Sequence, residues 1–333
     1  MSVRTSTLFL LLMFLPLLVL SQQKPQYSQY MINNYLLNPA IAGIENYVDI
    51  KSGYRNQWTG IDGAPNNFYL SIHTKLAKDK AIAPEAGSKT PSFVGEKEMR
   101  TIYRRAGAQP HHGIGLILLH DKIGPFTRLE ANVSYAYHMP LTEEIKLGAG
   151  ASAGISQHSL NGNKLVFANP ADAASAGWTV HRPNLKLGMW LYSSNFYAGL
   201  SASELISNTV SVGEEGGVDI NFENHYFSTA AYKISATRNL DVIPSVMVKL
   251  LQPLPLSVDY NLRAIYDNKL WAGVSYRQND SLALLGGITW NEVFDLGYSF
   301  DAGVSSLGGV SHEVVLGMRI PNRHRIVCPQ NLW

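Results

Sequence analysis

One stretch of the chain, residues 224–320, constrains the fold more than any other. Large apolar side chains alternate along it with polar or small ones, as in Phe294-Asp295-Leu296-Gly297-Tyr298-Ser299-Phe300-Asp301. Because successive side chains of a strand point to opposite faces, each such segment has one apolar face and one polar, often charged, face. A secreted sandwich or propeller rarely repeats this pattern over so many strands. The pattern therefore predicts a closed membrane barrel with its apolar face in lipid and its polar face around the lumen.

The start of the chain has the features of a secretion signal. Arg4 supplies a positive charge, and Leu8–Leu20 is an apolar run that is too short to cross a bilayer as a helix. We expect residues 1–21 to be a signal peptide, with Gln22 as the first mature residue. The remaining sequence has no apolar run of transmembrane-helix length. These features together predict an exported protein of the outer membrane.

The composition excludes several classes of function. Charged residues make up only 16% of the chain, below the roughly 25% of soluble domains. A formal net charge of +2 gives no basic surface for nucleic acid. The single cysteine, Cys328, cannot form an internal disulfide and suggests neither a metal cluster nor a nucleophile.

The alternation divides the chain into a barrel of about 14 strands, an even number as bacterial barrels require. We expect the barrel to span residues 47–320, with a periplasmic lead-in at 22–46 and a C-terminal tail at 321–333. The lead-in lacks clean alternation, and Asn38-Pro39 marks a turn in it. We expect it to tuck into the barrel mouth, and the alternative is a loose terminus. The sixth strand is expected from Asn184, and residues 204–222 are expected to be a loop.

The lengths of the connections orient the barrel. Those after the even-numbered strands are short, which is typical of the periplasmic end, and the longest of the others should face outward. Residues 77–111 break this rule, because they form a long basic insertion on the periplasmic side. Such a segment is either functional, a lineage-specific insertion or a solvated loop.

No catalytic motif accompanies this pattern. The chain lacks a nucleophile elbow, a His-Glu-x-x-His helix and a phosphate-binding loop. Side chains that could collect in the lumen include Asp259, Asp295, Asp301, His312 and Glu313, yet no nucleophile with an oriented base is marked among them. Ion pairing in a narrow lumen is the favoured interpretation. We expect no enzyme activity, no cofactor and no metal.

A series of short motifs resembles the PorP/SprF family of type IX secretion and gliding proteins of Bacteroidota. The series runs in order over nearly the whole mature chain, and its clearest members are Tyr30-Met31, Asn38-Pro39-Ala40-Ile41-Ala42-Gly43, Arg55-Asn56-Gln57-Trp58, Trp271-Ala272-Gly273 and Ser311-His312-Glu313. The resemblance implies an outer-membrane barrel, similar in size to FadL, that supports protein export or surface delivery. The length of the 77–111 insertion and the tail after the last strand depart from the family pattern.

The resemblance also implies partners. These are the periplasmic ring lipoprotein complex of the type IX system, the C-terminal domains of cargo or adhesins, and outer-membrane lipid, but no nucleic acid. The candidate docking residues are polar, basic or aromatic positions in the motifs and in the basic insertion: Asn38, Pro39, Arg55, Trp58, Arg100, Arg104, Arg105, His312 and Glu313. The alternative function is an outer-membrane transporter or porin for small hydrophobic or polar solutes.

Overall fold

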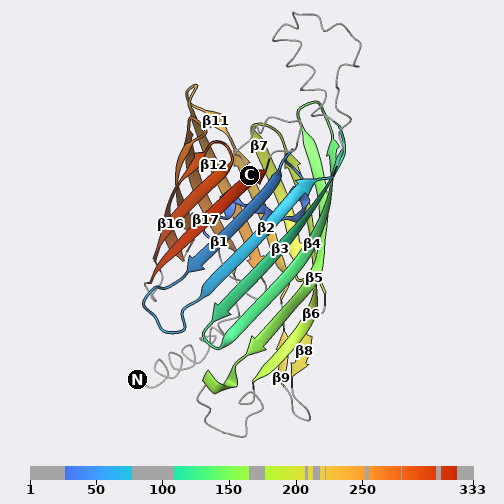
Figure 1. The fold of residues 1–333 in the computed structure, drawn as a ribbon, viewed down its shortest axis with the longest axis vertical. Coiled ribbons are helices and arrows are strands. Elements are labelled where there is room, and N and C mark those ends of the chain that lie inside the picture. The colour runs from blue at the N-terminus through green and yellow to red at the C-terminus, as the bar shows by residue number, and fades with distance from the viewer. Residues whose placement is uncertain are drawn as a thin grey trace, which may run out of the picture.

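The computed structural model describes residues 27–76, 109–164, 177–206, 209–212, 218–221, 223–251, 255–278, 280–304 and 309–320. Their antiparallel strands form one sheet that closes on itself, because β10 (His225–Tyr232) pairs with both β7 (Phe196–Ser203) and β12 (Leu240–Leu251) (Figure 1). The predicted closed antiparallel barrel is confirmed.

The barrel wall has 14 strands. The sheet contains 15 segments, but β10 and the short β11 (Ile234–Ser235) are consecutive parts of one wall strand that both pair with β12. The other wall strands are β1 (Val48–Asn56), β2 (Asn66–Lys75), β3 (His111–Ile123), β4 (Phe126–Pro140), β5 (Lys146–Leu160), β6 (Trp178–Tyr192), β13 (Ser257–Tyr266), β14 (Leu270–Arg277), β15 (Ser281–Trp290), β16 (Phe294–Gly303) and β17 (Val310–Ile320). The predicted number of strands is confirmed.

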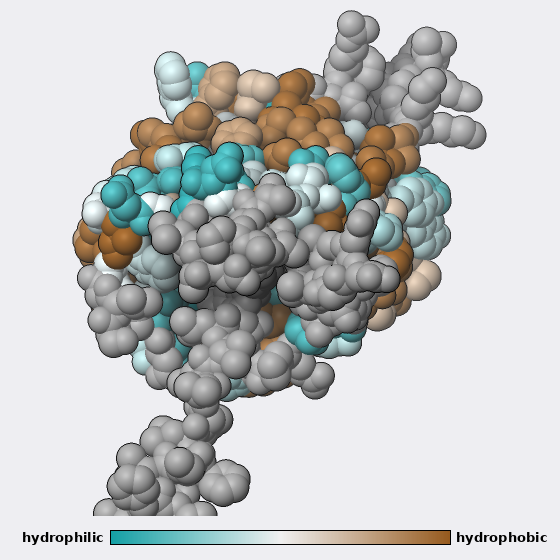
Figure 2. Space-filling model, turned by 90° about the horizontal axis from the view of Figure 1, so that it is seen from below, coloured by the Kyte–Doolittle hydropathy of each residue, from teal (hydrophilic) through white to brown (hydrophobic). Residues whose placement is uncertain are grey.

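The two faces of the wall differ as the alternation predicts. On β13, Tyr260 and Leu262 are exposed on the outside, whereas Asp259, Asn261 and Arg263 are buried inside. The same division holds along β4 and β16. Figure 2, which looks along the barrel, shows apolar side chains towards its periphery and hydrophilic ones nearer the centre. The exposed apolar face therefore has the chemistry of a lipid-facing surface.

Aromatic side chains mark both edges of the apolar face. Near the end at which β1 begins, the exposed aromatic residues are Tyr137, Tyr232, Tyr266, Trp290 and Phe294. Near the other end they are Tyr54, Phe68, Phe126, Tyr226 and Tyr276. Two such girdles flank the apolar band of membrane barrels, because an amphipathic ring is stable at the lipid–water boundary.

The two ends of the barrel have different connections. At the end where β1 begins, here called the turn end, five short turns join strands: 141–145, 193–195, 236–239, 267–269 and 291–293. Asp267 and Asn268 have positive φ angles of 52° and 53°, the backbone that tight hairpins prefer. The opposite end, here called the loop end, carries the longer connections 161–177 and 204–224. This distribution agrees with the prediction, and only the connection between β2 and β3 is long at the turn end.

Two segments differ from their prediction. Strand β6 begins at Trp178 rather than Asn184, because residues 178–183 continue its pairing with β5. The expected loop 204–222 contains a separate hairpin of β8 (Thr209–Val212) and β9 (Val218–Asn221). Both the extension of β6 and the β8–β9 hairpin lie towards the loop end.

A charge on the outer face tests the lipid contact. Leu284, near the middle of β15, is 57% exposed, and Leu284→Lys is expected to lower the free energy of unfolding in lipid vesicles by roughly 2–4 kcal/mol. Val304→Lys, which lies beyond the end of β16 at the loop end, should cost less than about 1 kcal/mol. Urea titration of both variants in vesicles measures the difference. Equal costs at the two positions would contradict a lipid contact at Leu284.

Candidate functional site

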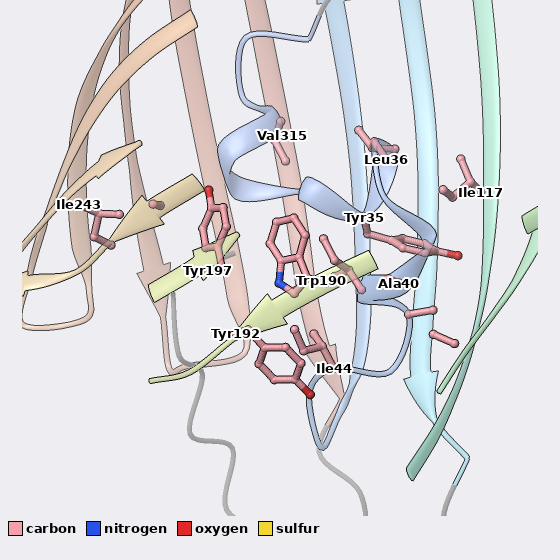
Figure 3. Packing of buried hydrophobic residues seen from close by; sticks show 14 of the residues in the cluster. Tyr35, Leu36, Ala40, Ile44, Ile117, Trp190, Tyr192, Tyr197, Ile243 and Val315 are labelled. Carbon is pink, nitrogen blue, oxygen red and sulfur yellow. The ribbon is translucent and has the colours of Figure 1, made fainter. Parts of the chain in front are cut away.

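Residues 27–44, here called the lumenal segment, run through the inside of the barrel. At the loop end Ser28 contacts Arg55 of β1, and at the turn end Ala42 contacts His138 of β4. Almost all of the segment is buried, and Figure 3 shows its Tyr35, Leu36 and Ala40 beside side chains of the wall. The expected lead-in therefore occupies the lumen over most of its described length.

The lumenal segment is folded as three single turns of 3₁₀-helix: η1 (Tyr30–Ile32), η2 (Asn34–Leu36) and η3 (Pro39–Ile41). Asn38 caps η3, since its Oδ1 accepts a hydrogen bond from the backbone N–H of Ala40 at 3.0 Å. Pro39 takes the first helical position, where its missing N–H costs nothing. The Asn38-Pro39 turn signal of the sequence thus corresponds to a helix start.

An ion-pair cluster anchors the segment at the loop end. Arg55 Nη1 lies 2.6 Å from Asp301 Oδ2 and 3.3 Å from Glu313 Oε2, and Arg55 is only 2% exposed. Ser28 joins this cluster: its hydroxyl accepts from Arg55 at 2.7 Å and donates to Asp301, and its N–H donates to Glu313 at 2.7 Å. Gln29 Nε2 also donates to the Glu313 carbonyl. Arg55 of β1, Asp301 of β16 and Glu313 of β17 therefore hold the first turn of the lumenal segment.

Side-chain hydrogen bonds hold the middle of the segment to opposite walls. Asn261 Nδ2 of β13 donates to the Tyr30 hydroxyl at 2.6 Å, and the Tyr35 hydroxyl donates to Ser134 Oγ of β4 at 2.9 Å. Asn33 adds a bond to Ser71 of β2. The segment is thus tied across the lumen rather than to one wall.

Helix η3 lies in a saddle of small residues on β5 and β6. A Cβ added at Gly150 would lie 2.6 Å from the Cα and N of Ala40, and one at Gly188 would overlap Asn38 Oδ1. Only glycine lets the wall approach the backbone this closely. Asn38 Nδ2 completes the contact by donating to the carbonyls of Met189 and Leu200, each at 3.0 Å. Gly150 of β5 and Gly188 of β6 therefore serve the close packing of the wall against η3.

Three histidines hold the segment at the turn end. His138 Nε2 lies 2.9 Å from the Ala42 carbonyl, and its Nδ1 lies 2.9 Å from the Tyr192 hydroxyl. His111 Nε2 lies 3.1 Å from the Gly43 carbonyl, and the His111 and His138 rings stack at 4.5 Å. The Gly43 N–H in turn donates to His73 Nδ1. Because a carbonyl can only accept, the contact with Ala42 places a proton on Nε2 of His138.

The remaining lumenal charges form separate ion pairs along the wall. Glu204 pairs with Arg128 at 2.7 Å and Arg182 at 3.5 Å, and Glu130 pairs with Arg128 and Lys186. The three aspartates that the sequence placed in the lumen form ion pairs with different cations: Asp259 with Lys249 and Arg277, Asp295 with Arg319 and Asp301 with Arg55. The predicted ion pairing of the lumen is confirmed.

The predicted docking residues fall in different places. Asn38, Pro39, Arg55 and Glu313 lie inside the barrel and hold the lumenal segment. Trp58, in the loop between β1 and β2, donates its backbone N–H to Ser311 Oγ. His312 is on the outer face, with its Nδ1 2.7 Å from the Tyr298 hydroxyl. Arg100, Arg104 and Arg105 lie outside the described residues. A docking role for these positions stays a prediction.

Sequence reasoning missed the histidines and the glycine saddle. His73, His111 and His138 all have the lumenal parity of their strands. Glycines at alternate positions of β3 and β5 were a usable signal, because a lumenal face of Gly113, Gly115, Gly148 and Gly150 leaves room for another segment. In the described part of the chain no group of three His, Cys, Asp or Glu could hold a metal ion.

The helices of the described residues are also short. None of them has the length and apolar character that a helical crossing of a membrane needs.

Removal of the Arg55 side chain tests the loop-end anchor. Arg55→Ala leaves two carboxylates buried without their cation, so it should lower the free energy of unfolding by roughly 3–5 kcal/mol. Lys269→Ala removes a cation from the exposed Lys269–Asp267 pair and should leave the unfolding midpoint unchanged. Denaturant titration of both variants in vesicles compares them. Similar midpoints for Arg55→Ala and the unchanged protein would show that the cluster contributes little to stability.

A second substitution tests whether the lumenal segment closes the lumen. Gly150→Ala places a Cβ against the backbone of η3 and should displace it, whereas Gly286→Ala meets no atom closer than 3.7 Å. We expect the first variant to conduct ions severalfold more than the second in planar bilayers. Equal, low conductance of both variants, with the barrel intact on heat-modifiable gels, would mean that the saddle does not control the seal.

Solved structures with a similar fold are membrane barrels. The CymD monoaromatic hydrocarbon channel is 12% identical, with a TM-score of 0.51 over 90% of this chain and 94% of that chain. The Ralstonia pickettii toluene transporter TbuX is 10% identical, with a TM-score of 0.50 over 86% and 92% of the two chains. A Pseudomonas aeruginosa FadL homologue is 10% identical, with a TM-score of 0.51 over 85% and 92%. At these identities the likeness shows the fold alone.

Sequence comparison identifies the family. No curated protein matches the chain. The family model described as "Type IX secretion system membrane protein PorP/SprF" matches residues 19–318, which include the lumenal segment and all but the last two residues of the final strand. The chain therefore belongs to the PorP/SprF family of type IX secretion system membrane proteins.

Proposed function

We propose that this protein is an outer-membrane barrel that supports type IX secretion by docking periplasmic partners and cargo. The observation that carries the proposal is that the lumenal segment fills the lumen of this member of a type IX secretion family. The lumenal segment is held at the loop end by Arg55, Asp301 and Glu313, and at the turn end by His111 and His138. A barrel filled in this way is suited to present its rims to other proteins rather than to conduct a polypeptide.

The proposed orientation places the turn end in the periplasm. Short turns are typical of the periplasmic end of outer-membrane barrels, and the connection between β2 and β3, which includes the basic residues 77–108, leaves the wall there. This end would then face the ring lipoprotein complex that the family implies. Of the predicted docking residues, Arg100, Arg104 and Arg105 belong to this connection, and we propose them as contacts for that complex.

Deletion of the gene in its own host tests the function. Surface delivery of a subset of type IX cargo should be lost and should return when the full chain is supplied. Cell-surface protease shaving followed by mass spectrometry measures delivery. Normal delivery of all cargo in the deletion strain would contradict the proposal.

Excision of residues 81–105 tests the docking step within the same strain. The variant should keep heat-modifiable barrel migration but co-purify less of its periplasmic partners than the full chain does. No other connection at the turn end is long enough for a matched excision. Alanine replacement of Glu143 and Glu144 in the short 141–145 turn therefore serves as the control. Loss of the barrel itself would assign the segment a structural role instead.

A second candidate function is transport of small solutes. The observation that favours it is a pocket of about 40 Å³ beside the lumenal segment, lined partly by Trp271, Ile265 and Val315. Hydrocarbon and toluene transport are properties stated for CymD and TbuX, which share only the fold with this chain. Substrate-dependent uptake into liposomes by the purified protein, together with normal cargo delivery in the deletion strain, would favour transport.

A further inference from the structure

The lumenal segment runs through the barrel in one direction. Its contacts with the wall move steadily from the loop end to the turn end as the residue number rises. In chain order, these contacts are Ser28 with Arg55, Asn33 with Ser71, Tyr35 with Ser134 and Ala42 with His138. Arg55 lies next to the loop-end terminus of β1, and His138 lies two residues before the turn-end terminus of β4. The segment therefore crosses the lumen once, and β1 then returns the chain to the loop end.

The burial of the segment begins at the rim of the loop end. Tyr27 is partly exposed, whereas Ser28 is only 1% exposed. The Tyr27 hydroxyl donates to Asp121 Oδ1 at 3.4 Å, and the Tyr27 ring meets the Tyr69 ring edge-on at 5.2 Å. Asp121 lies two residues before the loop-end terminus of β3. The chain that precedes Tyr27 therefore starts from this rim.

The first contacts of the segment lie at the seam of the barrel, where the first and last wall strands pair. Across the β1–β17 ladder Arg55 is directly opposite Glu313. Ser28 forms hydrogen bonds to both side chains, and its hydroxyl also donates to Asp301 of β16. Strands from both sides of the seam thus hold the same residue. This arrangement favours placement of the segment while the barrel closes rather than threading through a finished wall.

The space around the segment excludes a return path through the lumen. Residues 28–43 are almost all buried, because the segment and the wall already contact each other along most of its length. The pocket beside the segment has a volume of about 40 Å³, which is room for about three water molecules. A second stretch of polypeptide does not fit there.

We infer that the chain preceding Tyr27 leaves the barrel at the loop end, so that the N-terminus of the exported protein lies on the cell surface. This differs from the periplasmic lead-in that we expected from the sequence. The inference rests on the proposed function, and specifically on its orientation, in which the short turns are periplasmic. It gives the two ends of the barrel different roles in docking. The turns and residues 77–108 face periplasmic partners, and the N-terminal residues are accessible to partners outside the cell.

Cysteine labelling in intact cells tests the location of the N-terminus. Each variant also carries Cys328→Ser, and the reagent is a maleimide on a polyethylene glycol chain too large to cross the outer membrane. Lys24→Cys should react, as should Ile61→Cys in the exposed loop between β1 and β2 at the loop end. Lys269→Cys, exposed in a turn at the turn end, should react only after the outer membrane is permeabilised. A gel shift measures each reaction.

The outcomes separate the inference from the orientation on which it rests. Labelling of Lys24→Cys only after permeabilisation, with Ile61→Cys labelled in intact cells, would overturn the inference. Labelling of Lys269→Cys in place of Ile61→Cys in intact cells would overturn the orientation, and the cell-surface N-terminus with it. Normal cargo delivery in the deletion strain would contradict the secretion role without changing any labelling result.

A disulfide inside the barrel tests the path of the segment. Asn33 Nδ2 lies 2.9 Å from Ser71 Oγ of β2, so Asn33→Cys combined with Ser71→Cys should form a disulfide in cells. Asn33→Cys with Leu70→Cys is the matched control and should not form one, because Leu70 lies on the outer face of the same strand. Mass spectrometry of proteolytic fragments detects the bond. Its absence from both pairs, with heat-modifiable migration retained, would place the segment outside the lumen and overturn the inference.

Discussion

The structure depends on one constraint: polar groups enclosed by the barrel need hydrogen-bond or ion-pair partners. The lumenal segment has too little regular structure to satisfy its own backbone, so the wall must do it. Carbonyls of Met31, Ala42 and Gly43 face Arg263, His138 and His111 of the wall. In return the segment supplies Ser28, whose N–H and hydroxyl bond to Glu313 and Asp301. Without the segment, these polar groups of the wall would need water as hydrogen-bond partners, and without the wall the segment would need the same.

Two kinds of contact divide the wall between them. On β3, β5 and β6, glycines let the segment's backbone lie against the strands. On β13 to β17, longer side chains such as Trp271 and Arg263 reach the segment instead, and a pocket remains beside them. The position of the segment within the lumen therefore follows from where the chain places small residues. The same distribution decides which side of the lumen is sealed by packing and which side stays accessible.

The sequence was sufficient to predict the strands of the barrel wall but not how the lumenal segment is held inside it. Period-two alternation reports which face a side chain takes, so it located every wall strand and the lumenal charges. It failed at residues 178–183, where His181 and Pro183 interrupt the apolar face, and it grouped His312 with Glu313 although adjacent strand residues take opposite faces. It could not pair Arg55 with Asp301, because that contact depends on the register across β17. The lumenal segment has no periodicity, and only the alternating glycines hinted at its place.

The filled lumen limits how such a barrel can take part in secretion. Clearing the lumen would expose the buried carboxylates of Asp301 and Glu313 and detach carbonyls from two histidines at the other end, and these contacts lie at opposite ends of the barrel. A partner at one end can therefore loosen only part of the seal, and the rest keeps the segment in place. The chain also joins the segment to β1 through residues 45–47 at the turn end, so the segment stays attached to the wall there. A polypeptide path through this lumen is thus disfavoured, and the rims are the surfaces on which a secretion role can act.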